Sequence, residues 1–178
     1  MKKETYAERV NIALEYYEKA GIVLTDDEKA RIEVADFGLG RVEDIGLQLL
    51  TYINTDRVCA KEMVLTPYQT CPEHKHIPTD GFAGKEETFR CRFGKVYLYL
   101  PGEASAENIA ARYPSSDVTC FQEIVLNPGE QYTIMPETLH WFQAGKDGAV
   151  ISEFSTKSTD ETDIFTDLSI IRNPQIED

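Results

Sequence analysis

The amino-acid sequence predicts an all-β barrel or sandwich that is preceded by two α-helices. Two observations favour this class. From Gly46 onward the chain consists of short runs rich in β-branched and aromatic residues, and turn-forming residues separate these runs at a spacing of about ten residues. Before Gly46 the apolar residues recur every three or four positions instead, which is the period of an amphipathic helix.

The length, charge and composition narrow the range of functions. A chain of 178 residues is long enough for one domain with a substantial core, and we expect a single domain with helices in residues 1–40, a barrel in 46–156 and a tail in 157–178. The net charge of −13 argues against nucleic acid and against an anionic membrane surface as partners. The start of the chain lacks the apolar core of a secretion signal, so we expect a cytoplasmic protein with reduced thiols.

Two helices are predicted before the β-rich part. Apolar residues follow a helical period between Glu4 and Lys19, and Gly21 ends this first helix. The sequence TDDE, which begins at Thr25, is a capping box for a second helix. We expect the second helix to extend to Asp36, before the FGLG sequence, and both helices to pack on the outside of the sheet or on a partner subunit.

The predicted strands cover residues 46–55, 58–66, 87–93, 95–100, 118–126, 131–135, 140–143 and 149–156. Glycine-containing turns are expected at Gly94 and between Gly145 and Gly148, and residues 103–116 are expected to form an exposed polar connection. Because side chains alternate along a strand, Lys61, Met63 and Leu65 are predicted to share one face. The same rule groups the side chains of Glu87, Phe89, Cys91 and Phe93.

All three histidines of the chain fit a metal-binding pattern. His74 and His76 stand two positions apart, which on a strand directs both imidazoles to the same side. Glu87 begins the next predicted strand, and His140 follows a turn-rich connection. Three imidazoles and one carboxylate form a set that suits a divalent transition metal. The alternative is that these are ordinary hydrogen-bonded histidines at strand ends.

The pattern resembles the two sequence motifs of the cupin superfamily. HKH, followed by Glu87 and by Gly94 seven positions later, is similar to the first motif, G-x5-H-x-H-x(3,4)-E-x6-G, and Glu87 fits its spacing where Glu86 does not. The segment from Gly129 to His140 is similar to the second motif, although its internal proline and glycine are replaced. The gap between HKH and Glu87 is longer than in the family. The resemblance implies a cupin barrel, that is, a double-stranded β-helix or jelly roll.

A closer resemblance extends over nearly the whole chain. The segments AGIVLTDDE, GLQLLTYINTDR, CPEHKH, GKEETFRCRFGKVYLYL, PGEQYTIMPETLHWFQAG and TDIFTD, in this order, are similar to the cupin-type D-lyxose ketol-isomerases. This family implies a homodimer that interconverts free D-lyxose with D-xylulose, and usually D-mannose with D-fructose. It implies Mn²⁺ as the cofactor, with Co²⁺, Ni²⁺, Fe²⁺ or Zn²⁺ as alternatives.

Candidate catalytic residues follow from the reaction that this family implies. Isomerisation needs an acid/base group near carbons 1 and 2, and Glu153, a carboxylate within the apolar sequence VISEFS, is the first candidate. Lys61 is the second, either as a donor to the sugar oxygens or as a partner of Glu153. Trp141 and Phe142 are candidates for a wall of the sugar site, and Asp163 for its mouth. A solvent-facing glutamate, a surface lysine and aromatic core packing are the alternatives for these positions.

Other functions fit the same ligand set. A phosphosugar isomerase, an epimerase or a dioxygenase on the cupin fold stays open, and so does a non-catalytic sugar-binding cupin. Arg90 and Arg92 are expected to point away from Glu87, which counts against a phosphate site built from them. The preferred sugar, the native metal and the choice between a cis-enediol and a hydride-shift route are not decided by the sequence.

Overall fold

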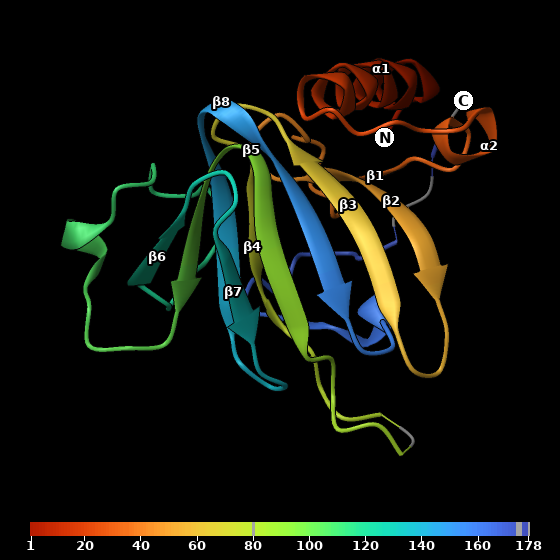
Figure 1. The fold of residues 1–178 in the computed structure, drawn as a ribbon. Helices are drawn as coiled ribbons and strands as arrows, with labels where there is room; N and C mark the ends of the chain where they lie inside the picture. The colour runs from red at the N-terminus through yellow and green to blue at the C-terminus, as the bar shows by residue number, and fades with distance from the viewer. Residues whose placement is uncertain (80, 174–175, 178) are drawn as a thin grey trace.

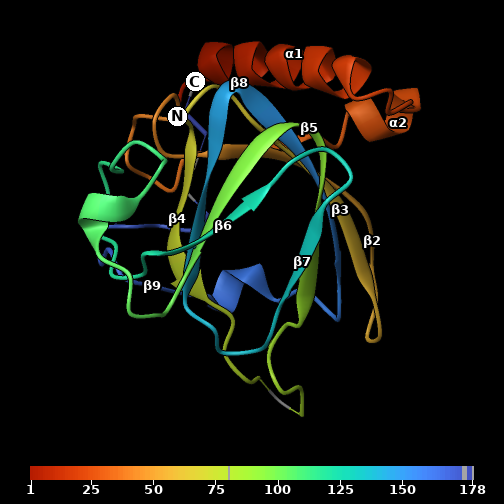
Figure 2. The same cartoon turned by 60° about the vertical axis from the view of Figure 1, so that its left-hand side comes forward.

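The computed structural model describes residues 1–79, 81–173 and 176–177, and in it the strands form one curled antiparallel sheet (Figures 1 and 2). The strands are β1 Glu33–Ala35, β2 Leu47–Asn54, β3 Cys59–Leu65, β4 Thr70–Lys75, β5 Glu87–Leu100, β6 Gln122–Leu126, β7 Gln131–Ile134, β8 His140–Ser155 and β9 Ile164–Phe165. Among the residues that the structure describes, helices occur only before this sheet, apart from two short 3-10 turns, Ala106–Asn108 and Asp160–Thr162. The prediction of an all-β fold with N-terminal helices is confirmed.

The two long strands β5 and β8 hold the sheet together. The strand β8 pairs with β3 through its second half and with β4 through its first half, while β5 pairs along both halves and also with β6 and β7. The predicted turns at Gly94 and Gly145–Gly148 are wrong, because both lie inside these long strands. Gly94 has a φ of 73° and sits where the backbone of Gly148 approaches too closely for a side chain, so it forms a bulge and not a turn.

Along the strands, side chains alternate between two apolar clusters. The inner cluster lies inside the curled sheet, and the outer cluster lies between the sheet and the first helix. Met63 and Leu65 of β3 pack in the inner cluster, and the side chain of Lys61 points to the same side, as predicted. The prediction for Phe93 is wrong, because a bulge between Cys91 and Phe93 shifts the register. Phe93 therefore lies on the outer side, where its ring meets Tyr16 edge to face at 6.0 Å.

The first helix, α1 (Lys3–Lys19), packs on the outer side of the sheet, across one end of β2, β3 and β8 (Figure 1). The second, α2 (Asp26–Lys29), is a single turn, although the capping box at Thr25 is present as predicted. The expected extension of α2 to Asp36 is wrong, because residues 33–35 pair with β2 as the edge strand β1. Among the described residues, no helix is both long and apolar enough to cross a membrane.

The C-terminal part of the chain returns to the barrel. We call residues 158–173 the C-terminal strap. Within it β9 pairs with β4, so that Phe165 lies opposite His74, and the hydroxyl of Thr166 donates a 2.6 Å hydrogen bond to the buried carboxylate of Glu73. Phe165 and Ile170 also pack against the inner cluster. The strap is thus part of the barrel wall and not an exposed tail.

Candidate active site

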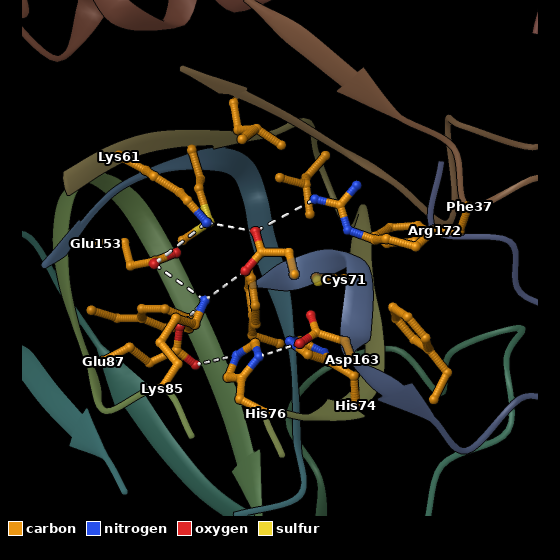
Figure 3. Close-up of a pocket in the computed structure, with 17 residues that line it drawn as sticks. Phe37, Lys61, Cys71, His74, His76, Lys85, Glu87, Glu153, Asp163 and Arg172 are labelled. Carbon is orange, nitrogen blue, oxygen red and sulfur yellow. Dashed lines mark hydrogen bonds and ion pairs between the residues drawn. The ribbon is translucent and has the colours of Figure 1, made fainter. Parts of the chain in front are cut away.

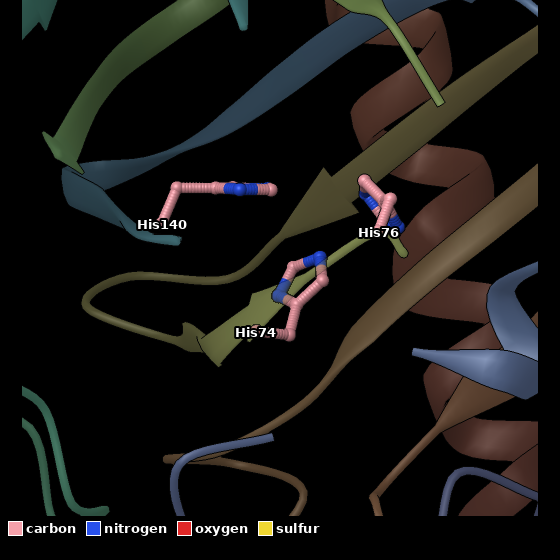
Figure 4. A group of neighbouring side chains, drawn as sticks. All are labelled: His74, His76 and His140. Atoms are coloured by element: carbon pink, nitrogen blue, oxygen red, sulfur yellow. The ribbon is translucent and has the colours of Figure 1, made fainter. Parts of the chain in front are cut away.

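Three strands bring the predicted ligands together at one end of a cavity inside the barrel. We call it the inner cavity, and its lining includes Lys61, His74, His76, Glu87 and Glu153. His74 lies on β4 opposite His140, the first residue of β8, and Glu87 is the first residue of β5. His76 follows the end of β4 directly. One ligand atom from each of the three histidines lies within 4.8 Å of the other two, and all three residues are buried (Figure 4).

Hydrogen bonds fix the orientation of the imidazole rings. The Nδ1 atoms of His74 and His140 lie 2.8 Å and 3.0 Å from the backbone carbonyls of Pro72 and Thr138. Because a carbonyl only accepts, both Nδ1 atoms must donate, and in a neutral ring this places the lone pair on Nε2. The Nδ1 atom of His76 lies 2.5 Å from a carboxylate oxygen of Asp163. Metal-binding histidines typically have such partners on their second nitrogen.

Glu87 completes the set from the opposite side. Its Oε1 atom lies 3.1 Å from the Nε2 atoms of both His76 and His140. The Nε2 atom of His140 is buried and has no hydrogen-bond partner among the described residues, although it lies next to this carboxylate oxygen. A cation between these atoms would satisfy both. Neutral imidazoles and a carboxylate are donors that divalent transition metals accept, so the residues fit the expected metal.

The pKa values in this group follow from burial and mutual charge. Burial, together with His140 and His76, lowers the pKa of His74 well below its usual value, which keeps this ring neutral. Burial opposes the charge on His76, but Glu87 and Asp163 outweigh it and raise the pKa to about 9. Burial also disfavours the charge on Glu87, yet Lys85 and His76 hold its pKa well below the usual range. Glu87 is therefore ionised and His74 neutral, and these are the states in which both side chains can bind a cation.

Glu153 and Lys61 face the same cavity, which Figure 3 shows in close-up. They are cross-strand partners on β8 and β3, and their charged groups lie 3.7 Å apart with both side chains at most 5% exposed. Burial works against the charge on Lys61, but Glu153 and Asp160 outweigh it and raise its pKa. The predicted pairing of these two residues therefore has its counterpart in the geometry.

Lys85 was not among the predicted site residues, although it occupies the middle of the site. Its Nζ atom lies 2.9 Å from Glu87, 3.2 Å from Glu153 and 3.2 Å from Asp160, so it connects the ligand set to the candidate base. Burial disfavours its charge, but the carboxylates raise its pKa well above the usual value. Alternation extended backward from Glu87 by two positions places Lys85 on the same side, and this signal would have found it.

The C-terminal strap contributes three further charged groups. Asp163 contacts His76 as described above, so it supports a ligand from within the cavity. Asp160 lies 2.5 Å from Lys61, and its carboxylate is 3.5 Å from the guanidinium of Arg172. Burial raises the pKa of Asp160, but Lys85, Lys61 and Arg172 outweigh this and hold it well below the usual range. Asp160 and Arg172 were not predicted, because no periodicity marks single residues in a segment of turns.

Comparison with known proteins places the chain in a family. The sequence model described as D-lyxose isomerase matches residues 18–178. The chain belongs to the D-lyxose isomerase family. The D-lyxose/D-mannose isomerase of Thermosediminibacter oceani is 59% identical over 100% of this chain and 99% of that protein. The D-lyxose ketol-isomerase of Cohnella laeviribosi is 57% identical over 99% of this chain and 98% of that protein. The expected membership is confirmed, and the chain is an aldose–ketose isomerase.

Solved structures agree with the cupin barrel expected for a D-lyxose isomerase family member. The L-ribose isomerase of Geodermatophilus obscurus has a TM-score of 0.69 and 14% identity, covering 95% of this chain and 94% of that chain. For the ligand-free L-ribose isomerase of Cellulomonas parahominis the TM-score is 0.67 at 15% identity, with coverage of 91% and 87%. At these identities the likeness shows the fold alone, and the cupin-like fold is confirmed.

The two aromatic candidates for a sugar wall lie on opposite sides of β8. Phe142 lines the cavity and packs edge to face on Phe89, with ring centres 4.9 Å apart. Trp141 does not line the cavity. Its indole stacks on Tyr99 at 4.0 Å in a separate outer cluster and donates a 2.7 Å hydrogen bond to the backbone carbonyl of Cys120. Adjacent residues of a strand point to opposite faces, so only one of this pair can reach the cavity.

Proposed function

We propose that this protein is a metal-dependent isomerase of free sugars that interconverts D-lyxose with D-xylulose and D-mannose with D-fructose. The observation that carries the proposal is the cluster of three buried imidazoles whose Nδ1 atoms are already hydrogen-bonded, with the Nε2 atoms of two of them, His76 and His140, lying 3.1 Å from the Oε1 atom of Glu87. His74, His76, Glu87 and His140 would hold the ion, and we propose Mn²⁺. The names of the two relatives support the choice of sugars.

The bound ion would supply Lewis-acid polarisation of the sugar carbonyl. The residues of this chain would then handle the proton. We assign the transfer of the carbon-bound proton to Oε1 of Glu153, which would take it from carbon 2 of the aldose and return it to carbon 1, while the hydroxyl proton of oxygen 2 moves to oxygen 1. The hydroxyl of Ser155 lies 3.0 Å from this oxygen, and Lys85 lies 3.2 Å from it. These contacts orient the carboxylate, and the two ammonium groups of Lys85 and Lys61 stabilise negative charge on the sugar oxygens.

A free sugar fits the cavity better than a phosphosugar. The cations that line the cavity, Lys61, Lys85 and Arg172, could be taken as a phosphate site. Each of them, however, already contacts a carboxylate, and Asp160 is a common partner of all three. A phosphate dianion would have to approach this carboxylate as well as the cations. Arg90 and Arg92, as predicted, do not line the cavity.

Metal removal tests the proposed function directly. Protein stripped with a chelator should produce no ketose from D-lyxose or D-mannose, and added Mn²⁺ should restore production of ketose. A Glu87→Ala variant should fail to bind Mn²⁺, as measured by the metal content after gel filtration. Ketose formation by fully stripped protein would contradict the assigned cofactor. The absence of ketose from either sugar in the Mn²⁺-loaded protein would contradict the assigned substrates.

We further propose a cytoplasmic homodimer with no nucleic-acid or membrane partner. The four cysteines are free and buried, which suits a reducing compartment. The net charge of −13 disfavours polyanions as partners. Ile53 and Phe154 are 47% and 52% exposed on the outside of the sheet, and an interface between two copies would cover such apolar side chains. Light scattering that gave the mass of one chain would contradict the dimer.

A further inference from the structure

We propose that Arg172 is a specificity-determining residue that binds the hydroxyl groups of the sugar farthest from the reacting carbons. This inference rests on the proposed function, because it takes the ligand set and Glu153 as the place where carbons 1 and 2 lie. The chemical class of the ligand is the hydroxyl-bearing end of an open-chain pentose or hexose.

Exposure identifies the side on which the cavity meets solvent. The side chains of Lys61, Lys85, Glu87, Glu153 and Asp163 are at most 5% exposed. Asp160 and Arg172 retain 19% and 18%. A second, polar cavity, which we call the outer recess, shares Lys61, Asp160 and Arg172 with the inner one and includes Thr51, Asn54 and Ser158. Arg172 therefore lies where the inner cavity joins the outer recess.

The charged groups form a chain from the reacting end to this junction. Glu87 contacts Lys85, Lys85 contacts Asp160, and Asp160 contacts Arg172. Figure 3 shows Arg172 on the side of the cavity away from Glu87 and Glu153. A sugar whose first two carbons lie at Glu87 and Glu153 extends toward solvent along this chain of contacts, so its later hydroxyls come within reach of Arg172.

Arg172 offers more hydrogen-bond donors than its contacts among the described residues use, and these donors can bind such hydroxyls. A guanidinium carries five N–H donors and no acceptor, and its planar fork can bind two neighbouring oxygens. Among the described residues its polar contacts are long, at 3.5 Å to Asp160 and 3.4 Å to the side-chain oxygen of Asn173. The guanidinium carbon lies over the ring of Phe37, 5.9 Å from the ring centre, so the two side chains form a cation–π contact. Sugar hydroxyls accept hydrogen bonds readily, so they match these donors.

The alternative is that Arg172 only fastens the strap to the barrel. Two variants distinguish these roles. Arg172→Met keeps the length of the side chain but removes the donors, whereas Arg172→Lys keeps the charge but loses the fork. Arg31→Met is the matched control, because the guanidinium of Arg31 also anchors a chain segment, through the backbone carbonyl of Thr51 at 2.9 Å, but does not line the inner cavity.

The experiment uses the Mn²⁺-loaded protein and two measurements. For Arg172→Met we expect KM for D-mannose to rise at least tenfold while kcat changes less than twofold. Calorimetric titration with unreactive polyols should show at least tenfold weaker binding of mannitol, which has six carbons, and less than twofold weaker binding of erythritol, which has four. Arg172→Lys should fall between wild type and Arg172→Met, and Arg31→Met should match wild type.

Two results would overturn the proposal. One is equal weakening of both polyols, or no weakening of either, in Arg172→Met. The other is a fall in kcat at unchanged KM, which a loosened strap would produce. If the wild-type protein forms no ketose, the proposed function fails, yet the difference between the two polyols in Arg172→Met against wild type still decides whether Arg172 binds distal hydroxyls.

Discussion

The barrel strands and the C-terminal strap contribute to the site in different ways. The strands supply the proposed ligands and the candidate base, on positions whose orientation follows from strand alternation. The strap supplies partners of those groups, since Asp163 contacts His76 and Asp160 contacts Lys61 and Lys85. The barrel thus fixes the chemistry of the site, whereas the fine geometry of the site depends on a segment with little regular structure. The following experiments separate the two contributions.

The largest effect is expected from a strand residue. His140→Ala removes a proposed ligand whose Nε2 atom has no hydrogen-bond partner in the part of the chain that the structure describes, and we expect Mn²⁺ affinity to fall more than about 100-fold, beyond the loss typical of a supporting residue. Ketose formation should fall with it. Competition against a chromophoric chelator measures the affinity. Retention of wild-type affinity would remove His140 from the ligand set.

The second-largest effect is expected from the candidate base Glu153, which lies on β8. Glu153→Gln preserves the shape of the side chain and its contact with Ser155 but cannot carry a proton, so kcat should fall by about 10²- to 10⁴-fold. The Mn²⁺ content should stay equal to that of wild type, because Glu153 is not a proposed ligand. Steady-state kinetics and metal analysis on the same sample check both. A fall of less than about tenfold would assign the proton to another residue.

The third-largest effect is expected from a residue of the C-terminal strap. Asp163→Asn weakens the 2.5 Å contact that orients His76, and outer partners of this kind are worth about 10- to 100-fold in metal affinity. Chelator competition should show that loss, while saturating Mn²⁺ should recover most of kcat. Loss of activity that Mn²⁺ does not recover would show that Asp163 acts on the sugar, which is the role considered for it from the sequence.

The smallest functional effect should come from a strap residue that contacts no site residue. Thr166→Val removes the 2.6 Å hydrogen bond to the buried carboxylate of Glu73, which should lower the free energy of unfolding by about 1.5 kcal/mol. Metal affinity should change less than about twofold, far below the loss typical of a supporting residue. Urea denaturation and chelator competition measure the two quantities. Equal losses of metal affinity in Thr166→Val and Asp163→Asn would mean that the strap affects metal binding only through its attachment to the barrel and not through the contact of Asp163 with His76.

Alternation and spacing made much of this site predictable. Glu87 was distinguishable from Glu86 by its spacing to Gly94, and Glu153 could be singled out as a carboxylate in an apolar strand. The prediction failed where one residue type is typical of two different local structures. Glycine marks both turns and bulges, so the continuity of β5 through Gly94 was missed. Asp160 could not be found, because its place depends on long-range packing of the strap against Lys61 and Lys85.

The single strand that carries both His140 and Glu153 has a consequence for changes in chain length. Their separation of 13 residues is odd, so both side chains point to the inner side only because the pairing with β5 shifts between Ala144 and Ala149. Removing one residue between Ala149 and Glu153 would turn Glu153 to the outer face, because side chains alternate within this regular part of the strand. Insertions and deletions should therefore be tolerated in the exposed connection around residues 103–108 and not within β8. A scan of single-residue deletions, scored by ketose formation, would show that this strand tolerates substitutions but not changes in its length.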